Sequence, residues 1–130
     1  MSRRFLDVAH HDQLQQHGGL PGIRDENALE SALARPQNRW SYKPDSTLLE
    51  LAACYCYGLA TAHGYSDGNK RIAFVATYTF LAMNDIEITA TQPAVVELIL
   101  AVASGRMQED KITEWLAANT APYVDDENRS

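Results

Sequence analysis

The chain has 130 residues, a length typical of one domain with a single hydrophobic core. Hydrophobic residues make up 45% of it, and its net charge of -6 argues against broad, unassisted binding to nucleic acid, which needs a basic face. No apolar run approaches the roughly 20 residues of a membrane span, and the first residues lack the apolar stretch of a signal peptide. We therefore expect a cytoplasmic domain, which can still carry a local basic cleft.

The first three predicted helices have recognisable ends. A helix over about residues 4–16 stops at the sequence HGGLPG, where three glycines and a proline forbid continuation. Asp25 is placed to cap a second helix, which we expect Pro36 to end. Thr47 and Glu50 have the spacing of a capping box that opens a third helix through about His63.

The rest of the chain predicts three more helices. The fourth, from about residue 68 to 83, is apolar or neutral almost all round from Ile72 onward, which is typical of an enclosed central helix. A fifth begins near Pro93, and a sixth carries Trp115 on its apolar stripe. Only Trp40–Tyr42 and Glu87–Thr89 read as strands. The pattern predicts an all-α single domain of about six helices over residues 1–130, with a frayed acidic tail at about 122–130.

A strongly polar stretch, HGYSDGNKR, joins the two most apolar helices. The N–H groups that begin the second of these helices have no internal partner and lie at the positive end of its dipole, so a glycine-bearing turn there favours anions such as phosphates. Lys70 and Arg71 add positive charge, Asp67 could hold a bridging Mg²⁺, and His63 could accept a proton. These groups together are what a phosphoryl- or nucleotidyl-transfer site requires.

Each fragment of this stretch also has a plain structural interpretation. His63 could simply end a helix, Asp67 and Gly68 could form an ordinary turn, and Asn69 could cap the next helix. Lys70 and Arg71 could be a solvated pair. The joint occurrence of all these residues at the start of a buried helix is what favours a functional site.

The stretch resembles the signature of the Fic/Doc superfamily, H-P-F-x-[DE]-G-N-G-R-x-x-R. The positions that agree are His63, Tyr65 (for Phe), Asp67, Gly68, Asn69 and Arg71. Gly64 replaces the proline, Lys70 replaces the second glycine, and Phe74 stands where the final arginine would be. Lys70 without that arginine is similar to the Doc (death-on-curing) branch, as is the upstream sequence GGLPGIRDENALESALARPQ. The resemblance covers nearly the whole chain.

The resemblance implies a Fic/Doc fold and a role for each residue of the signature. His63 would be the base that deprotonates a hydroxyl of a target protein, and Asp67 would hold Mg²⁺. Gly68, Asn69 and Lys70 would form the anion cradle for ATP, with Arg71 on its phosphates. All except Gly68 are also expected to be catalytic.

The resemblance also implies a reaction. Standard Fic enzymes transfer AMP to the target, whereas in the Doc branch the nucleotide binds in the reverse sense and the γ-phosphate is transferred. Because Lys70 favours the Doc branch, we expect a toxin kinase that phosphorylates a translation factor similar to elongation factor Tu and arrests translation. The alternatives are a Fic-type AMP transferase and an inactive antitoxin-binding co-repressor.

Two further expectations concern partners. Fic proteins position the target on a flap hairpin, and the alternating residues Arg39, Trp40, Ser41 and Tyr42 lie where a short flap hairpin would fall. The inhibitory pattern [ST]-x-x-x-E-[GN] does not occur in the sequence, which indicates an inhibitor in trans. In the Doc branch that inhibitor is an antitoxin whose C-terminal segment folds on the toxin, and it would supply the only, indirect, contact with DNA.

The remaining polar and aromatic residues are interpreted as structural. Cys54 and Cys56 are two residues apart and cannot face each other on a helix, so they are expected to be reduced, buried thiols. Glu30 and Arg35 are expected to form ion pairs. The others are expected at the surface or in packing (His10, His11 and His17) or in the core (Tyr55, Tyr57, Tyr78 and Phe80).

Overall fold

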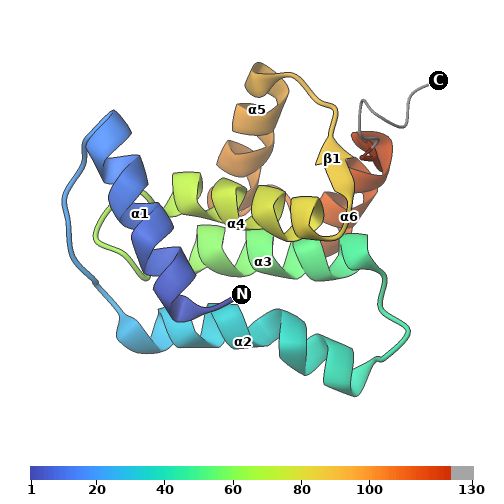
Figure 1. The fold of residues 1–130 in the computed structure, drawn as a ribbon, viewed down its shortest axis with the longest axis horizontal. Coiled ribbons are helices and arrows are strands. Elements are labelled where there is room, and N and C mark those ends of the chain that lie inside the picture. Colours follow the sequence, from blue (N-terminus) through green and yellow to red (C-terminus); the bar gives the residue numbers. More distant parts are fainter. Residues whose placement is uncertain (124–130) are drawn as a thin grey trace.

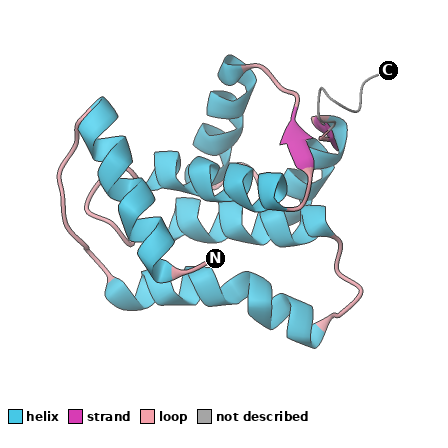
Figure 2. Cartoon of the chain, viewed as in Figure 1, coloured by secondary structure: helices cyan, strands magenta, loops and turns pink. Residues whose placement is uncertain are grey.

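A computed structural model describes residues 1–123 of the chain. The part of the acidic tail at 124–130 lies outside the described residues. The described part forms six helices and two short strands, confirming the expected all-α class (Figures 1 and 2). In chain order they are α1 (Arg3–His17), α2 (Glu26–Tyr42), α3 (Leu48–Ala62), α4 (Asn69–Met83), β1 (Ile86–Ile88), α5 (Gln92–Ala103), α6 (Glu109–Ala118) and β2 (Thr120–Pro122).

Helix α3 lies at the centre, with α2 along one side, α4 along another and α6 near its N-terminal end (Figure 1). Its buried residues cover most of its circumference, since Ala52, Ala53 and Gly58 are small enough for neighbouring helices to approach closely. Helix α4, which the sequence predicted to be enclosed, is instead buried on one side only. Tyr78, expected in the core, is 50% exposed on its other side.

The predicted helix starts are confirmed. The side chain of Asp25 accepts a hydrogen bond from the backbone N–H of Ala28, and Thr47 and Glu50 form both bonds of a capping box. Ser2 and Thr91 cap α1 and α5 in the same way. These caps satisfy N–H groups that would otherwise lack a partner, and each contributes about 1 kcal/mol.

Helix α2 is longer than predicted, and the expected flap hairpin is wrong. The helix passes through the buried Pro36 and ends only at Tyr42, before Pro44, so Arg39, Trp40, Ser41 and Tyr42 are helical rather than extended. A proline inside a helix costs about 3 kcal/mol. The burial of Pro36 and the ion pairs of Arg39 with Glu50 and Glu109 offset that cost.

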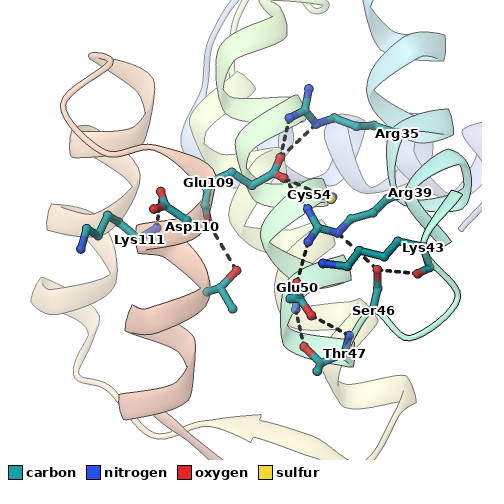
Figure 3. A network of polar contacts seen from close by, with 11 residues as sticks. Arg35, Arg39, Lys43, Ser46, Thr47, Glu50, Cys54, Glu109, Asp110 and Lys111 are labelled. Carbon is teal, nitrogen blue, oxygen red and sulfur yellow. Dashed lines mark hydrogen bonds and ion pairs between the residues drawn. The ribbon is translucent and has the colours of Figure 1, made fainter.

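Those ion pairs belong to a compact polar cluster between α2, α3 and α6, shown in Figure 3. We call it the ion cluster and define it by Arg35, Arg39, Glu50, Cys54 and Glu109. Glu109 accepts hydrogen bonds from Arg35 at 2.6 Å and from Arg39 at 3.2 Å, and Arg39 also bonds Glu50. The cluster ties the first and last thirds of the chain to the central helix.

The predicted thiols and ion pairs are confirmed. Cys54 and Cys56 are both buried and free, and burial raises the pKa of the Cys54 thiol to about 11, so it is protonated at neutral pH. Arg3 binds Glu30 as well as Glu26 and Asp7, and Arg35 binds Glu109.

The expected strand near residues 87–89 is present as β1, displaced by one residue. Its partner β2, which was not predicted, pairs with it antiparallel, so that Ile86 lies opposite Pro122 and Ile88 opposite Thr120. Across residues 1–123, no helix combines the length and the apolar character needed to cross a membrane.

Candidate functional site

The polar stretch from His63 to Arg71 connects α3 to α4 and lines a pocket of about 460 Å³. His63 ends α3 with a left-handed backbone (φ 51°), and Gly68 precedes α4 with φ 79°, so the chain reverses direction within a few residues. The C-terminal end of α5 forms the opposite wall through Leu100, Ala103 and Ser104.

This pocket contains every residue of the signature to which the sequence assigned a chemical role. They are His63, Asp67, Gly68, Asn69, Lys70 and Arg71. The four residues expected to form a flap, Arg39 to Tyr42, do not line it. Arg39 is engaged in the ion cluster, while Trp40 and Tyr42 are exposed on α2.

The start of α4 is uncapped, in contrast to α1, α2, α3 and α5. Gly68 offers no side chain, and within the described residues the backbone N–H groups of Asn69, Lys70 and Arg71 have no hydrogen-bond partner. Free N–H groups and a positive dipole end at the edge of a pocket form an anion-binding arrangement.

Asp67 is held with its carboxylate ionised. Its two oxygens accept hydrogen bonds from the backbone N–H groups of Leu20 (3.2 Å) and Gly68 (2.8 Å), and these bonds lower the pKa of the side chain below its usual value. A carboxylate has about four lone-pair sites, so each oxygen retains one for a further ligand.

A Mg²⁺ ion would fit this donor set only together with a ligand. Residues 1–123 contain no group of three or more side chains that could hold a metal by themselves. Mg²⁺ is commonly held by one or two carboxylates together with substrate phosphates, so the single carboxylate of Asp67 at an anion-binding helix start is consistent with it.

Asn69 and Arg71 are tied to the protein itself. The side-chain amide of Asn69 accepts from the backbone N–H of Tyr65 (3.0 Å) and donates to its carbonyl (2.9 Å), which closes the loop on itself. Arg71 donates to the carbonyl oxygens of Gly18 (3.0 Å) and Gln13 (3.4 Å) at the end of α1. Both residues therefore shape the pocket, whatever else they bind.

A buried histidine of α1, His10, packs against the loop. The ring of His10 stacks on Tyr65 with centroids 3.7 Å apart, and its Nε2 donates a hydrogen bond to the carbonyl oxygen of Asp67 (2.7 Å). The Tyr65 hydroxyl donates to Asp7 (2.7 Å). Hydrogen bonds from Tyr65 and Arg3 lower the pKa of Asp7 although partial burial opposes the shift. The expected packing role of His10 is confirmed.

The connection between α1 and α2 closes over the same loop. A Cβ on Gly19, which has φ 125°, would lie 2.8 Å from a carboxylate oxygen of Asp67 and 2.9 Å from Leu14. Only glycine fits this position without displacing Asp67 or Leu14. Gly19, the second glycine of the upstream GG, therefore allows the connection to approach Asp67 closely.

The sequence interpretation did not single out Arg24. This arginine lies in the same connection and lines the pocket. Its place in the sequence GGLPGIRD was available as a signal, but no spacing rule connects it with a loop about forty residues later. The link is a short antiparallel bridge between Ile23 and Tyr65.

An apolar groove of about 600 Å³ adjoins the pocket and shares Lys70, Arg71 and Leu100 with it. It runs between the end of α1, the exposed side of α4 and α5. Its lining includes Phe74, Tyr78, Val95, Val96 and Ile99. The exposure of Tyr78 is thus part of a continuous apolar surface beside a cationic pocket.

Comparison with known proteins agrees with this geometry. The model of the Fic/DOC family matches residues 1–81, which include α1 to most of α4 and the whole site loop. A protein named Toxin Doc from Mycolicibacterium smegmatis (strain ATCC 700084 / mc(2)155) is 40% identical over 75 residues. That match spans 56% of this chain and 57% of the relative, so it covers little more than half of either protein. The chain belongs to the Fic/DOC family.

Proposed function

We propose that this protein is the toxin of a toxin–antitoxin pair and acts as a protein kinase that transfers the γ-phosphate of ATP to a hydroxyl of a target protein. The observation that carries the proposal is the convergence of His63, an uncapped helix start and several cations in one pocket. The relative named Toxin Doc supports the toxin role. The proposed target is a translation factor similar to elongation factor Tu, and its modification would arrest translation.

The proposed reaction gives His63 one task. Its imidazole removes the proton from the target hydroxyl as the hydroxyl oxygen forms a bond to the γ-phosphorus, and the bond from that phosphorus to the bridging oxygen of ADP breaks. His63 is exposed at the pocket and is held in place by its backbone at the end of α3. A neutral imidazole can accept this proton.

The other groups hold and neutralise the ligand. The backbone N–H groups of Asn69, Lys70 and Arg71 at the start of α4 would donate hydrogen bonds to the phosphates. The Lys70 ammonium adds a positive charge that the glycine of the Fic pattern would lack. When bound, Mg²⁺ held by Asp67 would offset the charge of the phosphates.

Transfer of a labelled phosphate tests the proposal directly. Incubation with Mg-ATP labelled on the γ-phosphate should label elongation factor Tu, and His63→Ala should abolish the labelling. Label that is transferred only from the α-phosphate would contradict the kinase proposal. No label from either position, with harmless expression in cells, would favour an inactive antitoxin-binding co-repressor.

AMP transfer is the second candidate, favoured by Gly68, which matches the Fic pattern at a position where the Doc branch often has alanine. The two reactions add very different masses, because AMP is far heavier than phosphate. Intact-mass measurement of the target separates them. A Lys70→Gly variant, which restores the Fic pattern, should then reveal whether Lys70 decides the outcome.

We also propose that the apolar groove receives the C-terminal segment of an antitoxin. An amphipathic segment would place apolar side chains against Phe74, Tyr78 and Val96, and acidic ones near Lys70 and Arg71. Since the groove shares these cations with the pocket, an occupant would also obstruct the phosphate site. Tyr78→Glu should weaken the toxin–antitoxin complex by at least about tenfold in Kd, measured by calorimetry, without affecting transfer.

A further inference from the structure

We infer that Arg24 is a phosphate ligand of this pocket and acts on the phosphoryl group nearest His63. The inference rests on the proposed phosphotransfer function and adds to it a residue outside the HGYSDGNKR signature. Arg24 lies at the pocket edge on the connection between α1 and α2, about forty residues before the signature.

The backbone of Arg24 is fixed beside the loop from His63 to Arg71. Its N–H donates to the carbonyl of Gly64 at 2.8 Å, and the N–H of Asp25 donates to the same oxygen at 2.9 Å. One step further along, the N–H of Ser66 donates to the carbonyl of Gly22 at 3.0 Å. Gly64 directly follows His63, so the Arg24 side chain extends from a fixed point next to the proposed base.

The guanidinium of Arg24 is uncommitted, unlike those of most other arginines. Arg3, Arg35 and Arg39 bind carboxylates, and Arg71 binds two carbonyl oxygens. Within the described residues, the Arg24 side chain has no hydrogen-bond or ion-pair partner, although Arg24 lines the pocket. Arg4 also lacks a partner there and, like Arg24, is exposed, but it lines neither the pocket nor the apolar groove.

The charge of the pocket favours an anion. Arg24, Lys70 and Arg71 line it against the single carboxylate of Asp67, in a chain that has 17 acidic and only 11 basic residues. A guanidinium presents parallel N–H donors that match two oxygens of a phosphate. Because Arg24 starts beside His63 rather than at the helix start, it is placed to bind the group whose charge changes during transfer. Such a contact affects the rate as well as binding.

The test compares Arg24→Gln with Arg4→Gln, which makes the same change of charge on an exposed arginine of α1. Binding of Mg-free tripolyphosphate and of Mg-ATP is measured by calorimetry, and transfer by γ-label. Arg24→Gln should weaken tripolyphosphate binding on the order of tenfold and slow transfer by about 10²-fold. Arg24→Lys keeps the charge but lacks the parallel N–H donors of the guanidinium. Its tripolyphosphate affinity and transfer rate should lie between those of Arg24→Gln and the unchanged protein.

Other outcomes would overturn the inference. If the unchanged protein transfers phosphate and Arg24→Gln behaves like Arg4→Gln in both measurements, the role of Arg24 is wrong and the proposed function stands. If the unchanged protein neither binds Mg-ATP nor transfers phosphate, both fall. A lower melting temperature for Arg24→Gln alone would mean that its guanidinium holds the fold, and that too would contradict the inference.

Discussion

The ion cluster and the site pocket are both rich in charge, but they use it differently. In the ion cluster each carboxylate and guanidinium is bound by another member, as Figure 3 shows for Arg35, Arg39 and Glu109. In the pocket, by contrast, the backbone N–H groups that begin α4 have no hydrogen-bond partner within residues 1–123, and neither do the side chains of His63, Lys70 and Arg24. Hydrogen-bonding capacity that the fold leaves unused, rather than charge density, distinguishes a binding site from a structural cluster.

The largest expected effect is the loss of transfer in His63→Asn. Asparagine tolerates the left-handed backbone at this position, and the side chain is exposed, so the fold should be retained. Removing a general base costs about 10² to 10⁴-fold in rate. Label transfer from γ-labelled Mg-ATP measures the loss, with Glu109→Gln as the matched change in the ion cluster. Equal loss in both variants would erase the distinction between the two regions.

The largest expected effect on stability comes from Gly64→Ala. A Cβ there would lie 2.3 Å from the side chain of Leu29, which is buried and cannot move aside. We expect a fall of about 3 kcal/mol in the free energy of unfolding, measured by urea denaturation. Gly58→Ala in α3, where the added Cβ would meet ordinary contacts at 3.5 Å, is the control and should not destabilise the fold. An unchanged free energy of unfolding in Gly64→Ala would contradict the close packing of α2 against Gly64.

A smaller loss of stability is expected from Glu109→Gln. This change removes the charge that binds Arg35, Arg39 and the Cys54 thiol, leaving the partly buried guanidinium of Arg39 and the more exposed one of Arg35 less well paired. The free energy of unfolding should fall by about 2 kcal/mol. Calorimetry should show unchanged binding of Mg-ATP, because the ion cluster does not line the pocket. Weaker nucleotide binding at full stability would show that the two regions are coupled.

The smallest effect is a pH dependence carried by Glu50. The backbone N–H of Thr47 and then the Arg39 side chain lower the pKa of this carboxyl below 4.5. Its contribution to stability is therefore complete above about pH 4.5 and is lost as the pH falls through the lower value of the folded state. The stability gap between the unchanged protein and Glu50→Gln, at most about 1 kcal/mol at pH 7, should narrow below pH 4.5.

The urea midpoint at each pH measures that gap. Glu97→Gln, at an exposed glutamate of α5, is the control. A gap that is the same at pH 7 and pH 3 would contradict the role of Glu50.

Local signals in the sequence were sufficient for most of the fold. The capping residues Asp25 and Thr47 marked helix starts correctly, because an N-cap acts within a few residues. The helical end of α2 could not be foreseen, since Pro36 is tolerated only through burial and through Arg39 pairing with Glu109, which is 70 residues away. The flap was predicted from alternation of side chains, and tertiary contacts overrode that pattern.

The same limit applies to the site. The signature residues were predictable because they are contiguous and their chemistry is local. Arg24, Gly19 and His10 approach the loop only through the packing of α1 and of the α1–α2 connection, which no local spacing rule reveals. The sequence also could not indicate that the side chains of Asn69 and Arg71 donate hydrogen bonds to backbone carbonyl oxygens of the protein itself.

The central claim is that an anionic ligand binds where the fold leaves hydrogen-bond donors unused. Chemical-shift changes in ¹⁵N-labelled protein titrated with Mg-ATP test it most directly. We predict changes in the backbone amides of Asn69, Lys70 and Arg71 and in the side-chain Nε of Arg24, with Arg35 and Arg39 unaffected. Changes centred on the ion cluster, or none up to millimolar nucleotide, would contradict the account.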